Sequence, residues 1–244
     1  MRLSSSLTLF SLAQLATLVL GQGSDCAPGG TFDFSNWKLQ LPTGEEGHPD
    51  SISSSRLQGC GGYKSDVFYT GDDGALVMKV PGSPSTSDCV TTPNSNHCRT
   101  ELREDSPSKW SPSSGTNRLF GDLVVTQIDD DRVVVGQIHI DGAISTKPVC
   151  ELYYSSAGEL KMGVNKCITC SQASTPVGNV PVGERFTYEI RYENDVLSVS
   201  INGGGFKTLD TYDLNSPDSY FKAGNYNQGE GPTEVHFYSI KVSH

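Results

Sequence analysis

The sequence predicts an all-β fold, a jelly-roll sandwich of two antiparallel sheets in which one sheet has a concave outer face. Short runs of alternating apolar and polar residues recur along the chain between turn signals. Glycine and proline are frequent, with 26 and 13 copies, and no segment shows the apolar period of a long helix. Many short strands without strong helices are typical of two-sheet sandwiches.

The expected strands follow one another with short turns between them. The segments GDDGA and ENDV each separate two such runs and are typical of hairpin turns. No internal repeat or linker interrupts the pattern. The expected strands cover residues 37–41, 63–70, 75–80, 99–104, 117–128, 133–141, 149–155, 159–164, 185–193, 196–201, 220–226 and 234–242.

Residues 1–21 have the pattern of a secretory signal peptide. Arg2 supplies a basic start, residues 7–20 are mostly apolar, and cleavage is expected near Gly21–Gln22. A membrane anchor is the alternative, but the run is interrupted by Ser11 and Gln14 and is shorter than the roughly 20 residues of a spanning helix. We therefore expect a secreted, extracellular protein without a membrane partner, in which residues 22–244 form one β domain.

The chain is acidic, with a formal net charge of −10 at pH 7. This charge argues against non-specific binding of nucleic acid. It also disfavours any other polyanion, unless the protein gathers positive charge at one place.

Seven cysteines follow the predicted signal peptide, and secretion makes disulfides expected. Cys89 and Cys98 are expected to close a loop, and Cys167 and Cys170 a tight one. Cys26 and Cys60 are candidates for a third disulfide, which would leave Cys150 as the odd thiol. For CITC (167–170), a zinc or redox motif is the alternative, but no second metal-ligand pair follows it. The long irregular segment 81–98 ends against an expected strand and is predicted to line or cover one end of a cleft, since long loops in compact domains are usually functional.

Three of the expected strands place unusual polar residues on one face. Successive side chains in a strand point to opposite faces, so residues of one parity lie together. If the three strands are neighbours, this face gathers positive charge beside a histidine and a tyrosine. The face holds Arg99, Glu101 and Arg103 from RTELR (99–103), Gln137 and His139 from QIH (137–139), and Lys222, Tyr226 and Gln228 from YFKAGNYNQ (220–228).

This combination suits the cleavage of a 1,4-linked uronic acid polymer by β-elimination. The C5 hydrogen of a uronate is weakly acidic, and its removal builds negative charge on the neighbouring carboxylate. Arginine and glutamine donors at that carboxylate stabilise the charge. Histidine, with an ordinary pKa of about 6.5, serves as the base, and a tyrosine phenol serves as the acid that protonates the leaving oxygen.

The three motifs resemble the signature motifs of the alginate lyases of polysaccharide lyase family 7, in that family's order. The resemblance implies a β-jelly roll with a substrate cleft across its concave sheet. It implies that Arg99, Gln137, His139 and Tyr226 are catalytic. Arg99 and Gln137 would neutralise the carboxylate, His139 would be the base for guluronate, and Tyr226 would be the acid, or both acid and base for mannuronate. Substrate binding is assigned to Glu101, Arg103, Lys222 and Gln228, although Glu101 is expected to hold the arginines in place rather than to contact sugar.

The resemblance implies an acidic polysaccharide, alginate, as the partner. In that family, isoleucine in the QIH motif goes with guluronate-containing substrates and valine with mannuronate, so the resemblance at Ile138 implies guluronate-containing chains. A glucuronan lyase and a non-catalytic uronate-binding lectin remain alternatives. A glycoside hydrolase is disfavoured, because that chemistry uses two carboxylates and no E-x-D-x-E strand is present. No cofactor or metal is expected, since arginine and lysine supply the neutralising charge, and DDDR (129–132) is interpreted as a solvated turn rather than a calcium loop. The protein is expected to be a monomer.

Overall fold

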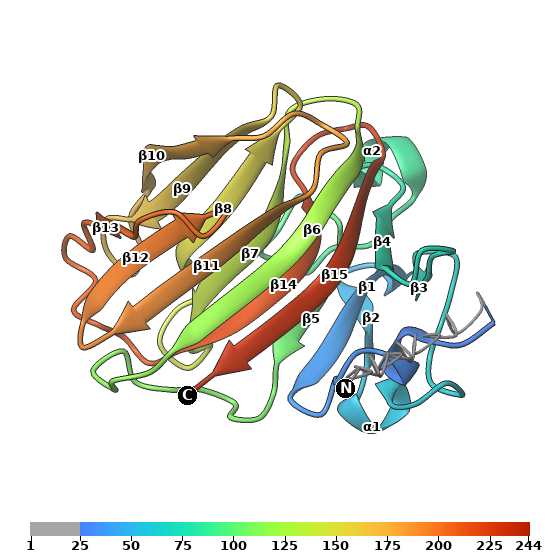
Figure 1. Ribbon diagram of the computed structural model, residues 1–244, viewed down its shortest axis with the longest axis horizontal. Coiled ribbons are helices and arrows are strands. Elements are labelled where there is room, and N and C mark those ends of the chain that lie inside the picture. The colour runs from blue at the N-terminus through green and yellow to red at the C-terminus, as the bar shows by residue number, and fades with distance from the viewer. Residues whose placement is uncertain (1–24) are drawn as a thin grey trace, which may run out of the picture.

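Two antiparallel β-sheets face each other and make up nearly all of the regular secondary structure (Figure 1). The computed structural model describes residues 25–244, so the predicted signal peptide 1–21 lies outside the described residues. The first sheet, here the cleft sheet, contains β1 (Trp37–Glu45), β2 (His48–Ile52), β5 (Arg99–Glu104), β7 (Arg132–Ile140), β8 (Pro148–Ser155), β9 (Glu159–Asn165), β10 (Gln172–Asn179) and β14 (Ser219–Asn227). The predicted all-β sandwich is confirmed.

The second sheet, here the back sheet, has seven strands. The strand order is β10-β9-β8-β7-β14-β5-β1-β2 in the cleft sheet and β13-β12-β11-β6-β15-β4-β3 in the back sheet. Only short helices occur among residues 25–244: the 3₁₀-helix η1 (Pro28–Gly30), α1 (Ser54–Leu57) and α2 (Pro84–Ser87). The back sheet consists of β3 (Phe68–Thr70), β4 (Leu76–Val80), β6 (Arg118–Ile128), β11 (Phe186–Glu193), β12 (Val196–Ile201), β13 (Lys207–Leu209) and β15 (Thr233–Ser243).

The differences from the predicted strands lie mainly at the sheet edges, although the interior strand β1, predicted as 37–41, also continues to Glu45. The sequence analysis missed β2, β10 and β13, each of which is an edge strand. The predicted strand 63–70 is wrong in extent, because the edge strand β3 covers only Phe68–Thr70. Edge strands are covered on fewer sides, so they lack the apolar alternation that identifies a strand. β10 illustrates this, because its residues are all at least partly exposed and include Pro176.

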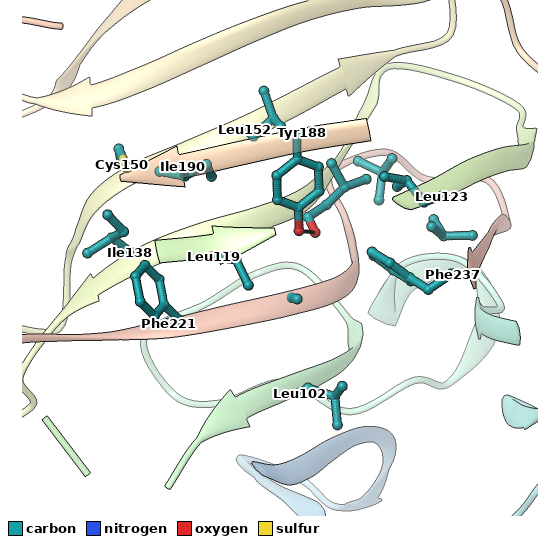
Figure 2. Packing of buried hydrophobic residues seen from close by; sticks show 14 of the residues in the cluster. Leu102, Leu119, Leu123, Ile138, Cys150, Leu152, Tyr188, Ile190, Phe221 and Phe237 are labelled. Carbon is teal, nitrogen blue, oxygen red and sulfur yellow. Dashed lines mark hydrogen bonds between the residues drawn. The ribbon is translucent and has the colours of Figure 1, made fainter. Parts of the chain in front are cut away.

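The core lies between the sheets, and Figure 2 shows Tyr188 at its centre among aliphatic and aromatic side chains. The Tyr188 hydroxyl donates a hydrogen bond to the Val135 carbonyl of β7 over 2.9 Å. Two glycines make room for this ring. A Cβ at Gly121 would lie 2.4 Å from a ring carbon of Tyr188, and one at Gly136 would lie 2.6 Å from its hydroxyl oxygen. Tyr188 of the back sheet thus holds β7 at a fixed distance from the back sheet, next to Gln137.

All three predicted disulfides are present: Cys26–Cys60, Cys89–Cys98 and Cys167–Cys170. Cys150 is a free thiol buried in the core, and burial raises its pKa to about 12. Among residues 25–244, no helix combines the length and the apolar character that crossing a bilayer requires.

Candidate active site

The three motif strands are direct neighbours in the cleft sheet. β14 lies between β5 and β7, and it runs antiparallel to both. Lys222 faces Arg103 on one side and Gln137 on the other, while Tyr226 is paired with Arg99 and Tyr220 with His139. Segments more than 80 residues apart in the chain therefore form one continuous surface, as their shared parity predicts.

An open cleft of about 560 Å³ lies over these strands. Seven of the eight predicted site residues line it: Arg99, Arg103, Gln137, His139, Lys222, Tyr226 and Gln228. The cleft continues across β8, β9 and β10 and is bordered by two loops. The first loop, before β5, contributes Thr92, Asn94 and Ser95, and the second, between β7 and β8, contributes residues around 142 and 145–148. The region of β8, β9 and β10 contributes Glu151, Asn165, Cys170, Ser171 and Gln172. Loop 81–98 thus lines the cleft, as expected.

Glu101 is the exception, because its side chain is only 1% exposed and does not line the cleft. The assignment of Glu101 to the substrate-binding residues is therefore wrong, because its side chain does not reach the cleft. Its carboxylate lies beneath the cleft floor and accepts three hydrogen bonds, from Lys222 Nζ at 2.5 Å, Arg99 at 3.2 Å and Gln137 Nε2 at 2.5 Å. This arrangement matches the expectation that Glu101 orients its neighbours and contacts no sugar.

The buried cluster of Glu101, Arg99 and Lys222 holds two cations and one anion. Burial opposes the charge of Glu101, but Lys222 and Arg99 outweigh it and hold the pKa of the carboxyl below its usual value. Burial and the nearby Arg99 lower the pKa of Lys222 to about 8. With one more cation than anion, the cluster attracts a carboxylate that enters the cleft above it.

His139 is held in the form that accepts a proton. Its Nδ1 lies 2.8 Å from the carbonyl of Ile140, so Nδ1 carries the hydrogen and Nε2 keeps a free lone pair. Burial and the positive charge of Lys222 lower the pKa of His139 to about 4. The imidazole is therefore neutral at pH 7.

Tyr220 supports this imidazole, which the sequence analysis did not foresee. Its ring stacks on His139 with centroids 5.1 Å apart, and the Arg103 guanidinium lies 4.1 Å from the Tyr220 ring centroid. Tyr220 shares the parity of Lys222 and Tyr226, so the pattern itself contained the signal.

Tyr226 presents its phenol to the same cleft from the other end of β14. The Arg99 guanidinium lies 3.5 Å from the centroid of its ring, and its hydroxyl lies 3.0 Å from Ser95 Oγ. His97 meets the ring edge-on. Ser95 belongs to the irregular loop before β5, and nothing in its local sequence indicates where the folded loop places it.

A second polar group lies on the cleft floor beyond Gln137. Glu151 on β8 is paired with Gln137 in register and accepts hydrogen bonds from Tyr153 at 2.6 Å and Gln172 at 2.5 Å. The sequence analysis missed Glu151, although its position between the buried Cys150 and Leu152 indicated the opposite face of the sheet.

The arrangement can therefore bind an anionic group, accept a proton at His139 Nε2 and donate one from Tyr226. The side chains for these steps come from three neighbouring strands, with Arg99 on β5, His139 on β7 and Tyr226 on β14. Glu151 is the only carboxylate among the cleft-lining residues of the described chain. Chemistry that needs two carboxylates facing each other across a sugar bond therefore has no support here.

Comparisons with known proteins agree with this chemistry. A family model described as alginate lyase matches residues 32–244. A curated alginate lyase from Klebsiella pneumoniae is 27% identical, over 98% of this chain and 96% of its own length.

Solved structures give the same result. The chain is similar to alginate lyase A1-II′, a member of polysaccharide lyase family 7, with a TM-score of 0.76, 32% identity, and coverage of 89% of this chain and 98% of that one. A doubly substituted form of that enzyme in complex with a substrate, GGMG, gives a TM-score of 0.76 and 31% identity over 90% of this chain and 97% of that one. Because the family model matches most of the chain, the chain belongs to the alginate lyase family, polysaccharide lyase family 7, and is a polysaccharide lyase.

Proposed function

We propose that this chain cleaves alginate, in particular guluronate-containing alginate, by β-elimination at 1,4-linked uronates. The observation that supports the proposal best is the composition of one cleft: a neutral imidazole and a phenol face it above a buried cluster with excess positive charge. The GGMG substrate of the similar enzyme A1-II′ supports an acidic oligosaccharide as the occupant.

In the proposed reaction, the carboxylate of the uronate that loses its C5 proton lies against Arg99 and Gln137. His139 Nε2 removes the C5 proton, and the electron pair of that C–H bond forms the C4–C5 double bond. The C4–O4 bond breaks, and O4 takes the hydroxyl proton of Tyr226. Arg99 and Gln137 stabilise the charge that develops on the carboxylate before the bond breaks. The products are a new reducing end and a 4,5-unsaturated uronate.

The preference for guluronate rests on stereochemistry. A base separate from the acid suits a C5 hydrogen on the opposite face from the leaving oxygen, as in guluronate. Ile138 is fully buried on the core side of β7, so its side chain can influence this preference only through the position of its neighbours. For mannuronate, Tyr226 would act as both base and acid.

The test is to offer polyguluronate, polymannuronate and glucuronan separately and to follow the ultraviolet absorbance of the unsaturated product. We expect the signal to be strongest with polyguluronate and to be lost with His139→Asn and Tyr226→Phe, while both variants still bind the polymer. His48→Asn, at an exposed position on β2 outside the cleft, serves as the matched control. Binding without an absorbing product would favour a lectin, shorter chains without absorbance a hydrolase, and a signal with glucuronan alone the glucuronan alternative.

We also propose that the protein is secreted as a monomer. The three disulfides suit an oxidising compartment, and residues 1–21 have the signal-peptide pattern described above. N-terminal sequencing of the protein from culture medium should begin near Gln22. Size-exclusion chromatography should give the mass of one chain, and a dimer mass at micromolar concentration would contradict the second part of this proposal.

A further inference from the structure

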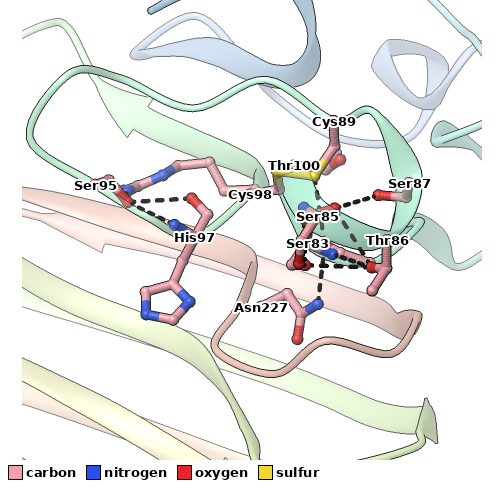
Figure 3. Close-up of a disulfide and its surroundings, with 12 residues drawn as sticks. Ser83, Ser85, Thr86, Ser87, Cys89, Ser95, His97, Cys98, Thr100 and Asn227 are labelled. Carbon is pink, nitrogen blue, oxygen red and sulfur yellow. Dashed lines mark hydrogen bonds between the residues drawn. A yellow bond between two sulfur atoms is a disulfide. The ribbon is translucent and has the colours of Figure 1, made fainter.

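The loop between Cys89 and Cys98 reaches the candidate active site through one side chain. Its disulfide joins the loop ends, and Arg99 follows Cys98 directly as the first residue of β5. Between the two cysteines Pro93, Asn94 and Asn96 are exposed, whereas Ser95 is half-buried and its hydroxyl lies against Tyr226. Figure 3 shows Ser95 and His97 on the side of the disulfide opposite α2 and its serines.

Ser95 Oγ lies at the meeting point of four polar groups. It is 3.0 Å from the Tyr226 hydroxyl and accepts hydrogen bonds from Arg99 at 3.2 Å and from the backbone N–H of His97 at 3.1 Å. It donates to the His97 carbonyl at 3.1 Å. A serine hydroxyl has one hydrogen and two lone pairs, so these four contacts are not all made at once, and the hydrogen points either to the His97 carbonyl or to the Tyr226 hydroxyl.

We propose that Ser95 is a positioning residue for Tyr226, and that the Cys89–Cys98 disulfide acts in catalysis by holding Ser95 in place. The inference rests on the proposed role of Tyr226 as the acid. In the resting enzyme, Ser95 fixes the direction of the phenol over the Arg99 guanidinium.

During the reaction, Ser95 also stabilises the charge that Tyr226 acquires. The phenol proton goes to O4 as the C4–O4 bond breaks, which leaves a phenolate. The Ser95 hydroxyl then rotates from the His97 carbonyl to donate to the phenolate oxygen, and its hydrogen stays on Ser95 throughout. Together with Arg99, this places a hydrogen bond and a positive charge at the new anion, the arrangement that stabilises oxyanions in enzymes.

The disulfide is needed because little else fixes this loop. Within it, the Ser95 N–H donates to the Thr92 carbonyl at 3.0 Å, and the Val90 N–H donates to Pro42 of β1 at 2.8 Å. The segment between α2 and β5, residues 88–98, contains no helix or strand. Without the Cys89–Cys98 bond, the segment that bears Ser95 would sample many more conformations.

The first test compares Ser95→Ala with Ser95→Thr by product absorbance at saturating polyguluronate. We expect Ser95→Ala to lower kcat about 10- to 100-fold with KM within about twofold, and Ser95→Thr, which keeps the hydroxyl, to recover most of the rate. Ser87→Ala is the control, because this half-buried serine on α2 does not line the cleft and its hydroxyl donates to the Ser83 carbonyl. An unchanged kcat in Ser95→Ala would overturn the proposal.

A double-mutant cycle separates this inference from the proposed function. In a Tyr226→Phe background, Ser95→Ala should cause no further loss of the residual rate, because the group that it positions is gone. If Tyr226→Phe alone keeps a near-native rate, the acid assignment fails. If Tyr226→Phe loses activity and Ser95→Ala does not, only the present inference fails.

The second test removes the disulfide. Cys89→Ala/Cys98→Ala should lower kcat to a similar extent as Ser95→Ala, and adding Ser95→Ala to it should change little more. The control, Cys26→Ala/Cys60→Ala, removes a disulfide away from the cleft and should lower the unfolding temperature while kcat holds. A folded Cys89→Ala/Cys98→Ala protein with wild-type kcat, checked by circular dichroism, would overturn the role of the disulfide.

Discussion

Glu101→Gln tests whether the cations of the cleft depend on the buried carboxylate beneath them. All three of its partners, Lys222, Arg99 and Gln137, donate hydrogen bonds to Glu101. A glutamine has the same shape, but its NH₂ group must face one of these donors and cannot accept a hydrogen bond from it. The substitution therefore leaves a donor without an acceptor and two buried cations without their anion.

Breaking a buried ion pair by removing one partner typically costs about 3–5 kcal/mol. Because glutamine keeps one accepting oxygen, we expect the lower end, a loss of about 3 kcal/mol in the free energy of unfolding at pH 7. The pKa of Lys222, already lowered to about 8, should fall further, which leaves less positive charge in the cleft. KM for polyguluronate should rise in consequence.

The assay is urea denaturation of Glu101→Gln and the wild type at pH 7 and pH 9. Above its pKa of about 8, Lys222 loses its proton in the wild type as well, so the ion pair is lost there too and the difference between the proteins should shrink at pH 9. The control is Glu159→Gln, which breaks an exposed pair with Lys161 and should cost less than about 1 kcal/mol. A loss for Glu101→Gln no larger than that of the control would refute the reasoning.

Three further outcomes are expected. Because the pKa of His139 is about 4, the acidic limb of kcat/KM should fall near pH 4; a limb near the ordinary value of about 6.5 would contradict this. The buried Cys150 thiol, with a pKa of about 12, should not react with a thiol reagent until urea unfolds the chain, and rapid reaction of the native protein would contradict its burial. Gly136→Ala should lower the free energy of unfolding by about 1–3 kcal/mol because its Cβ would collide with Tyr188; an unchanged melting temperature would contradict that packing.

The sequence predicted the central strands well and the edges poorly. The predicted strand 99–104 matches β5 (Arg99–Glu104) residue for residue, and 220–226 falls one residue short of β14 at each end. These strands are packed by neighbours on both sides, so burial imposes a regular pattern on them. β2 and β10 have a neighbour on one side only, and their sequences are free to be polar and to contain proline.

The same distinction separates the predicted from the missed residues of the candidate site. His139 and Tyr226 follow from strand parity, which is a local property of the sequence. Ser95 contacts Tyr226 only because an irregular loop folds back and a disulfide closes it. Neither the path of this loop nor the contact follows from the alternation of residues in the sequence. The burial of Glu101 beneath the cleft also depends on its three partners, which come from three different strands.

The strand order has a consequence for how the chain matures. The last two strands along the chain, β14 and β15, each insert into the interior of a sheet: β14 separates β5 from β7, and β15 separates β6 from β4 (Figure 1). Until β14 and β15 leave the ribosome, both sheets are split, and four unsatisfied backbone edges are exposed to other chains. Both sheets therefore close only after β15 has emerged, and a nascent chain that stalls before β14 would be prone to aggregate and would lack Tyr226.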